Sequence, residues 1–172
     1  MSRYDTAPYD VLEKDGVFEI RRYGPFFTAA VKESNLVETM GFNQVFSYIN
    51  GNNADREKIS MTVPVINDLN ESHKTTEFVM PSQFNESGPP QPTDSRVEIR
   101  KYEQRLVASI TFSGNVDSNK ISKFKNQLLD WLAKTEWKPT GDFLMARYNS
   151  PFTLLIFRRN EILAVLEESK IP

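Results

Sequence analysis

One short sequence pattern occurs twice in this chain. Residues 18–23 read FEIRRY and residues 97–102 read VEIRKY, with the same order of apolar and charged positions. The similarity continues in the same frame, because FTAAV at residues 27–31 matches LVASI at residues 106–110. A repeated sheet-and-helix unit leaves an apolar face uncovered when it stands alone. The repeat therefore predicts two similar halves that close on each other, with a ligand cleft at their seam.

Composition narrows the possible functions. The chain has 172 residues, a net charge of -2 and no cysteine. Disulfides, thiol catalysis and thiolate metal sites are therefore excluded. Acidic and basic residues are interspersed without a basic stripe, so we expect no nucleic acid partner. No apolar run approaches the length of a membrane span, and residues 1–5 lack the apolar core of a signal peptide. We expect a cytoplasmic protein without membrane insertion.

Local patterns predict the elements of the first half. Residues 14–16, which end in Asp-Gly, form a hairpin turn between two apolar runs. A helix over residues 37–50 is predicted from an apolar stripe that recurs at helical spacing. The members of this stripe are Phe42, Val45, Phe46 and Ile49. The expected strands are residues 9–12, 17–23, 27–31, 58–66 and 76–80, with Pro64 marking an edge or a bulge.

The second half repeats this plan after a proline-rich connection over residues 81–95. A helix capped by Asp117 or Ser118 is expected to run to about Lys134. The expected strands are residues 97–102, 106–112, 143–148, 152–158 and 162–166. These elements predict an α+β fold in a single domain over residues 1–172, with an internal duplication of about 9–80 and 97–167.

Several segments go beyond general patterns. They include MTVPV at residues 61–65, MP-x-x-F at 80–84 within a loop that runs to Pro92, ARYNSP at 146–151 and RRNE at 158–161. In this order and spacing they resemble the SOUL haem-binding protein family over nearly the whole chain. The sequence is also similar to the effector-binding domains of the GyrI-like superfamily.

The resemblance implies a distorted antiparallel β-barrel of two pseudo-symmetric halves, each with one flanking helix. It also implies that haem or another porphyrin, a small planar hydrophobic ligand, binds without a covalent bond in an apolar groove beside the first helix. That groove is implied to involve the loop after residues 146–151 as well. The positions that match are Phe42 and Phe46 on that helix and Tyr148 ahead of Pro151. Met61, on the adjoining strand, is a further candidate.

Each of these residues also has a purely structural interpretation. Phe42 and Phe46 lie one helical turn apart, which suits either a porphyrin face or a core position under a sheet. Met61 can pack against a ligand or fill the core. The Tyr148 hydroxyl can contact a ligand, supply phenolate to iron or hold its own turn.

Charged residues near the expected groove are sparse. His73, the single histidine, lies in a polar connection and is expected to be solvated rather than to bind iron. Residues 36–50 contain no Lys or Arg that could pair with propionates. Lys32, Arg56 and Lys58 flank the helix and could take that role.

Other charges are expected to be structural. Residues 158–161 are predicted to form the turn into the last strand. Residues 21–22 and 100–101 are predicted to form a solvated face that pairs with Glu19 and Glu98.

The sequence lacks a nucleophile elbow, a phosphate loop and a clustered set of metal ligands. We therefore expect a non-enzymatic carrier or buffer of haem or porphyrin. The alternative is a sensor or effector-binding domain for a different small molecule. A third possibility, a hydrolase on the same scaffold, requires a buried carboxylate without a cationic partner.

Overall fold

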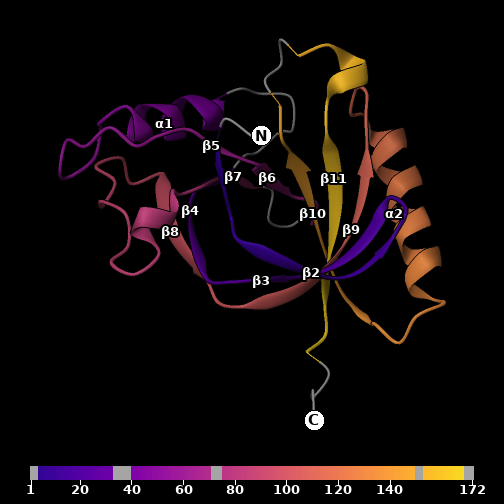
Figure 1. The fold of residues 1–172 in the computed structure, drawn as a ribbon. Coiled ribbons are helices and arrows are strands. Elements are labelled where there is room, and N and C mark those ends of the chain that lie inside the picture. Colours follow the sequence, from indigo (N-terminus) through magenta and orange to yellow (C-terminus); the bar gives the residue numbers. More distant parts are fainter. Residues whose placement is uncertain (1–3, 33–39, 71–74, 150–152, 169–172) are drawn as a thin grey trace. The chain divides into compact units, whose positions relative to one another are not determined.

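The computed structural model describes residues 4–32, 40–70, 75–149 and 153–168. The chain divides into two compact units, residues 1–8 with 25–103 and residues 9–24 with 104–172. In the described residues, each unit combines antiparallel strands with an α-helix (Figure 1), so the α+β class is confirmed. The two strands with the similar sequences belong to the units opposite to their order in the chain. Strand β3 (Phe18–Tyr23) belongs to the second unit, and β8 (Val97–Tyr102) belongs to the first.

The first unit is built on an antiparallel sheet in the order β6-β7-β4-β8. The bounds of the other three strands are Val65–Asp68 for β6, Thr75–Val79 for β7 and Phe26–Lys32 for β4. A short parallel pair joins β1 (Asp5–Thr6) to β5 (Thr62–Val63). Helix α1 spans Met40–Ile49, and the 3₁₀ turn η2 spans Ser82–Phe84.

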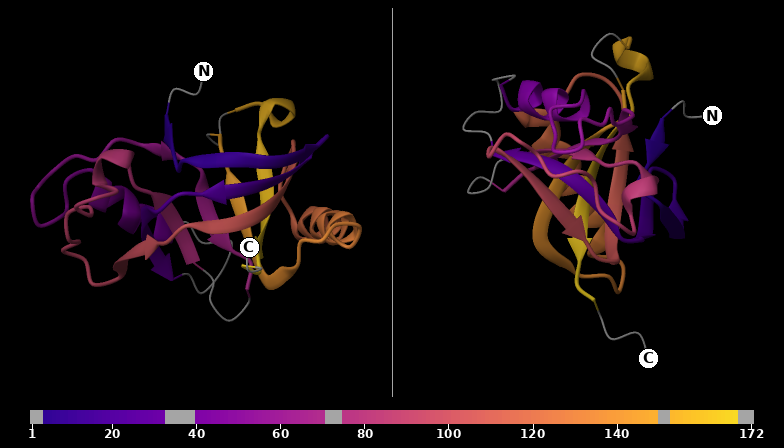
Figure 2. Two further views of the ribbon diagram at one scale, coloured as in Figure 1. Left: turned by 60° about the horizontal axis from the view of Figure 1, so that its bottom comes forward. Right: turned by 90° about the vertical axis from the view of Figure 1, so that its left-hand side faces the viewer.

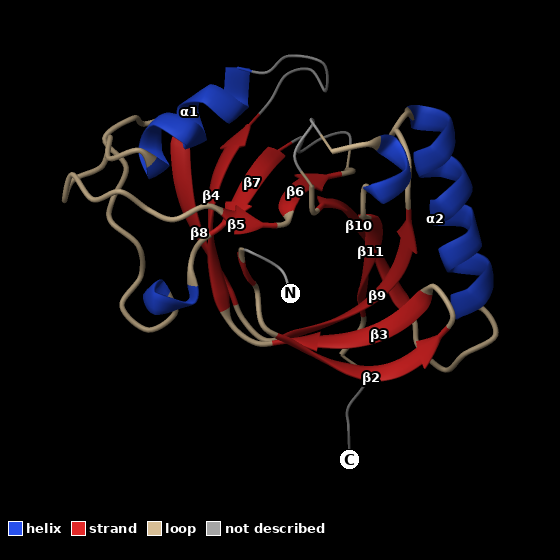
Figure 3. Cartoon of the chain, turned by 45° about the horizontal axis from the view of Figure 1, so that its top comes forward, coloured by secondary structure: helices blue, strands red, loops and turns tan. Residues whose placement is uncertain are grey.

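Helix α1 covers one face of this sheet, as Figure 3 shows. Its buried side chains, Val45, Tyr48 and Ile49, pack in a cluster with sheet residues that include Ala29 and Phe78. The Tyr48 hydroxyl donates a hydrogen bond of 2.6 Å to the carbonyl oxygen of Pro90, which fixes the helix against the long connection. Val45 and Ile49 of the predicted stripe are therefore confirmed as core residues.

The second unit contains a sheet in the order β2-β3-β9-β11-β10. The bounds are Tyr9–Asp15 for β2, Arg105–Phe112 for β9, Asn160–Leu166 for β11 and Pro139–Arg147 for β10. Helix α2 (Ser118–Leu132) packs on β9 and β11 (Figure 3), and the 3₁₀ turn η3 spans Leu155–Phe157.

Strand alternation gives this second sheet two different faces. The face under α2 is apolar and carries Ile20, Ala108, Ile110 and Ile162, all fully buried, with Phe112 stacked on Phe124 at 4.1 Å. The other face carries polar side chains from β3, β9 and β11. Several of these side chains are buried and bond to one another, as Arg21 and Thr111 do with Glu161, whereas the buried Ser109 hydroxyl has no hydrogen-bond partner among the described residues.

Several sequence expectations need correction. The strand order within each unit is open, so the closed barrel is not confirmed in the described residues. The expected strand 58–66 is divided at Pro64 into β5 and β6, since proline cannot donate a ladder hydrogen bond. In the expected strand 152–158, the described residues form the turn η3 instead. None of the described helices is long and apolar enough to cross a membrane.

The predicted cap of the second helix is confirmed. The Asp117 side chain accepts a hydrogen bond of 2.8 Å from the backbone N–H of Lys120. Such a bond satisfies one of the free N–H groups in the first helical turn.

Replacement of this cap should destabilise the fold. We expect Asp117→Ala to lower the free energy of unfolding by about 1 kcal/mol, because one N–H loses its acceptor. Asp117→Ser, which keeps an acceptor at the same position, should retain most of the stability. Urea denaturation of the three proteins provides the measurement, and equal midpoints for wild type and Asp117→Ala would contradict this role.

Candidate functional site

A buried carboxylate organises the polar face of the second unit. Glu161, at the start of β11, is fully buried. Its two oxygens accept hydrogen bonds from both terminal nitrogens of Arg21 at 2.7 and 2.8 Å. Further donors are Arg159 Nη2 at 2.7 Å, the Tyr148 hydroxyl at 2.8 Å and the Thr111 hydroxyl at 3.2 Å. We call these five residues the Glu161 network.

Aromatic rings surround the two guanidinium groups of this network. Arg21 lies 4.4 Å from the centre of the Tyr9 ring, and Arg159 lies 4.1 Å from the centre of the Tyr148 ring. Arg21 also donates to Glu19 at 2.7 Å. Each charge is therefore paired, hydrogen-bonded and placed against a π face, which is how proteins retain buried ions.

Protonation equilibria follow from this packing. Burial alone would raise the pKa of Glu161, but the hydrogen bonds and charges of Arg21 and Arg159 outweigh it and lower the pKa to about 2. Burial and the nearby negative charge of Glu161 raise the pKa of Tyr148. At neutral pH the carboxyl is therefore ionised and the phenol keeps its proton.

The first unit has a related cluster around Glu77 on β7, which is 3% exposed. Glu77 accepts hydrogen bonds from three side chains. The donors are Arg100 at 2.9 Å, the Tyr102 hydroxyl at 2.8 Å and the Thr28 hydroxyl at 2.9 Å. Arg100 also pairs with Glu98 at 3.2 Å. Each unit thus holds a buried glutamate bonded to an arginine from a repeated strand.

This arrangement corrects the expectation of a solvated basic face. Arg21 is fully buried, and Arg100 is partly buried. The predicted partners Glu19 and Glu98 are confirmed, but the principal partners Glu161 and Glu77 come from strands farther along the chain. The structural role expected for residues 158–161 agrees with the place of Arg159 and Glu161 in the network.

The candidate ligand contacts of the first unit lie at the surface. Phe46 on α1 is 44% exposed, and Met61, just before β5, is 39% exposed. A hydrogen bond from the Ile59 N–H to the Ile49 carbonyl, 2.8 Å long, holds the segment before Met61 to the end of α1. The backbone of Phe42 lies in α1, but its side chain falls outside the described residues.

Tyr148 lies just after β10 in the second unit and is partly buried. Its hydroxyl is engaged by Glu161, and its ring carries the Arg159 guanidinium. Its backbone N–H donates to the Arg159 carbonyl at 3.1 Å, which supports the expected role in the local turn.

The remaining candidate ligands are distributed as follows. His73 lies outside the described residues. The described residues contain no group of three or more His, Asp or Glu side chains suited to a metal ion. Lys32, Arg56 and Lys58 are all exposed.

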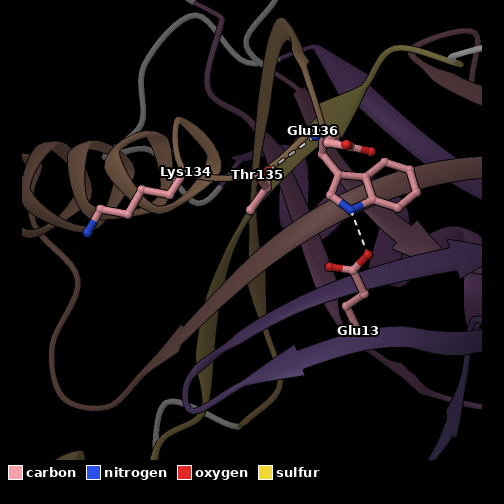
Figure 4. A pocket seen from close by; sticks show the side chains of 5 residues that line it. Glu13, Lys134, Thr135 and Glu136 are labelled. Atoms are coloured by element: carbon pink, nitrogen blue, oxygen red, sulfur yellow. Dashed lines mark hydrogen bonds between the residues drawn. The ribbon is translucent and has the colours of Figure 1, made fainter.

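The second unit also has a polar surface pocket of about 400 Å³. Figure 4 shows its lining residues, Glu13, Lys134, Thr135, Glu136 and Trp137. The Trp137 indole N–H donates to Glu13 at 3.0 Å, so these two polar groups of the pocket already bond to each other. An apolar planar ligand finds little complementary surface there.

Comparisons with known proteins identify the class. The family described as "SOUL heme-binding protein" matches residues 4–165. The chain belongs to this family. It is 33% identical over 175 residues to "Heme-binding protein 2" of Homo sapiens and 32% identical over 173 residues to the Mus musculus protein of that name. Each alignment covers 91% of this chain and 81% of the relative.

A solved structure shares the fold at much lower identity. It is titled "Crystal structure of a hydrolase from Listeria innocua", and it matches with a TM-score of 0.63 at 6% identity. The match covers 91% of this chain and 94% of that chain. At this identity the similarity concerns the fold alone.

The described residues fit a porphyrin face better than they fit a strongly ligated iron. Haem iron is usually held by His, Cys, Met or Tyr. The sequence has no cysteine, and the Tyr148 hydroxyl already donates to Glu161. Met61 offers an accessible thioether, and Phe46 offers an accessible ring.

The Glu161 network predicts acid sensitivity. The pKa of Glu161 is lowered from an ordinary 4.5 to about 2, so the stability it contributes is complete above pH 4.5 and is lost as the pH falls towards 2. The loss should amount to roughly 3 kcal/mol in the free energy of unfolding. Glu161→Gln should lack this acid-dependent component and should be about 3–5 kcal/mol less stable at pH 7, because the terminal nitrogens of the buried Arg21 lose their carboxylate and Glu19 is left as its ion-pair partner.

Urea denaturation between pH 2 and 7 provides the measurement. Glu103→Gln is the matched control, since Glu103 is 76% exposed in its pair with Lys101, and its pH dependence should equal that of wild type. If Glu161→Gln proves too unstable to measure, the double variant Arg21→Met/Glu161→Gln removes the buried arginine charge together with the carboxylate. An unchanged acid dependence in either Glu161 variant would contradict the assignment.

Proposed function

We propose that this protein binds haem or a related porphyrin without a covalent bond and acts as a reversible carrier or buffer. Membership of the SOUL heme-binding protein family supports the ligand class. The observation that carries the proposal is the exposure of Phe46 on α1, which is 44% exposed. An exposed ring on a rigid helix suits contact with a flat apolar ligand.

The proposed contact surface contains the exposed residues Phe46 and Met61. The sequence-based candidate Phe42, whose side chain lies outside the described residues, is proposed to extend it. A porphyrin face on such a surface would bury on the order of 200–300 Å² of apolar area, worth roughly 5–8 kcal/mol. Association costs remove part of this gain. We therefore expect affinity on the order of micromolar, which suits a carrier that both takes up and releases its ligand.

Polar contacts would come from groups around this surface. Arg56 and Lys58 follow α1 and are exposed, and Lys32 ends β4. These cations could pair with propionates, as the sequence analysis proposes. When bound, haem would supply an iron centre, towards which the chain offers the Met61 thioether.

The first test is a hemin titration of the apo-protein, followed by the Soret band. Wild type should show a saturable one-to-one change, and Phe46→Ala should weaken the affinity by about tenfold because an exposed aromatic contact is lost. Val17→Ala, which changes another apolar residue of 51% exposure in the second unit, is the matched control and should bind as wild type does.

Two results would count against this proposal in different ways. Equal hemin affinity for wild type and Phe46→Ala would contradict the proposed contact surface on α1 but not haem as the ligand. A linear absorbance increase without saturation would contradict haem as the ligand.

The role of Tyr148 can be separated from that of Phe46. Its hydroxyl donates to Glu161, and its pKa is raised by burial, so phenolate ligation of iron would have to break a buried hydrogen bond. We expect Tyr148→Phe to leave the Soret position and the hemin affinity unchanged. A shifted Soret band in this variant would assign Tyr148 to the iron.

A second candidate is a sensor or effector-binding domain for a small molecule other than a tetrapyrrole. The absence of Lys and Arg from residues 36–50 favours this alternative, because propionates would then lack partners on the helix itself. The hemin titration separates the two, since a non-haem ligand predicts no saturable change.

We further propose that the protein is not an enzyme. A hydrolase on this scaffold would require a buried carboxylate without a cationic partner. The two buried glutamates of the described residues, Glu77 and Glu161, each bond to arginine at 2.9 Å or less. Such pairing occupies both carboxyl groups with arginine, which does not suit a general acid.

A further inference from the structure

An exposed apolar turn lies between β10 and β11 in the second unit. Leu154, Leu155, Ile156 and Phe157 are 67%, 48%, 73% and 67% exposed. Figures 1 and 2 show the turn η3 at the ends of β10 and β11, where it projects beyond the strands. Scattered exposed apolar residues are ordinary, but consecutive ones on one turn usually mark an interaction site. We call residues 154–157 the apolar turn.

Part of the backbone of the apolar turn is hydrogen-bonded within the protein. The Phe157 N–H donates to the Leu154 carbonyl at 2.9 Å, and the Leu155 carbonyl accepts from the N–H groups of Arg158 at 3.2 Å and of Gly114 at 2.9 Å. The Arg158 side chain donates to the Thr153 carbonyl at 2.8 Å. These bonds hold the shape of the turn and lower the cost of moving it into a less polar environment.

Positive charge borders the apolar turn. Arg147 is exposed, and Arg158 is half-buried. Arg159 lies next to them but is paired with Glu161 at 2.7 Å, so its charge is compensated. The Lys120 ammonium lies beside Gly114, which bonds to the turn. The nearby Asp117 carboxylate accepts from the Lys120 N–H as the helix cap. The border of the turn is therefore cationic.

We propose that the apolar turn is a peripheral docking site for an anionic lipid membrane. Apolar side chains on a projecting turn with a cationic border match the two parts of such an interface, the acyl boundary and the negatively charged headgroups. The proposed contact is peripheral and is made by a turn, so it differs from a membrane-spanning insertion. This proposal does not rest on haem binding.

Surface area favours a bilayer over a protein partner. A stable protein interface needs roughly 800 Å² from each partner. The side chains of the apolar turn supply only about half of that at most, and they project rather than form a groove. A bilayer needs no complementary groove, since its acyl chains rearrange around what enters.

Vesicle flotation tests the proposal. The protein should float with vesicles of phosphatidylcholine that contain about 30% phosphatidylserine at low salt, and less with phosphatidylcholine alone. Ile156→Ser/Phe157→Ser should lower the partition coefficient at least tenfold, roughly the effect of two lost apolar contacts. Added salt should weaken binding, because headgroup attraction is screened.

Matched variants separate a specific effect from a general one. Val17→Ser replaces another exposed apolar residue, of 51% exposure, elsewhere in the second unit and should float as wild type does. Lys120→Gln should reduce binding about fivefold, the effect of one cation near the surface. Because Val17, Ile156 and Phe157 are exposed, thermal melts of their variants should coincide with wild type.

Four outcomes would overturn the proposal. The first is that wild type does not bind anionic vesicles, and the second is that it floats to the same extent as Ile156→Ser/Phe157→Ser. Sedimentation velocity could instead reveal a dimer that this variant dissociates, without vesicle binding, which would make the turn a self-association surface. Loss of hemin affinity in the variant, again without vesicle binding, would assign the turn to the ligand site.

Discussion

The pair between Arg21 and Glu161 is the interaction on which the second unit depends. The two residues lie on β3 and β11, which flank β9, so the pair reaches across the central strand. A shift of β3 by one residue would move Arg21 to the apolar face under α2, where no acceptor of this kind lies among the described residues. A buried ion pair often adds little net stability, but it penalises the wrong register strongly. We infer that its main effect is to specify the pairing of these strands.

Sequence patterns predicted the positions of helices and strands better than they predicted which side chains are buried. Helix α2 and its cap follow from apolar spacing and from Asp117, which are local signals. Alternation placed Glu19 and Arg21 on one face of a strand, but it gave no information on whether that face is covered. A single acid at the start of the otherwise apolar strand from Asn160 to Leu166 was the available sign that a buried cation must lie nearby.

The candidate site was only partly predictable for a similar reason. The apolar stripe that contains Phe46 allows the helix to be rotated so that either Phe46 or Tyr48 faces the core. Tyr48 faces the core because its hydroxyl donates to the Pro90 carbonyl. This contact depends on a loop that is distant in sequence. Residues 152–158 have the composition of a strand, yet the described part is turned by local hydrogen bonds and pairs with no neighbouring strand. Propensity alone could not exclude a pairing that only the tertiary structure decides.

The exchange of β3 and β8 between the units has a consequence for how the chain is made. A nascent polypeptide leaves the ribosome from its N-terminus, at about 5–20 residues each second. The first unit cannot complete its sheet until residues 97–102 emerge, and the β2–β3 hairpin must wait for β9 and β11 to gain its permanent neighbours. A gene divided within the proline-rich connection would therefore encode an N-terminal fragment that lacks β8 and a C-terminal fragment that lacks β2 and β3. Those fragments would have to meet in order to fold.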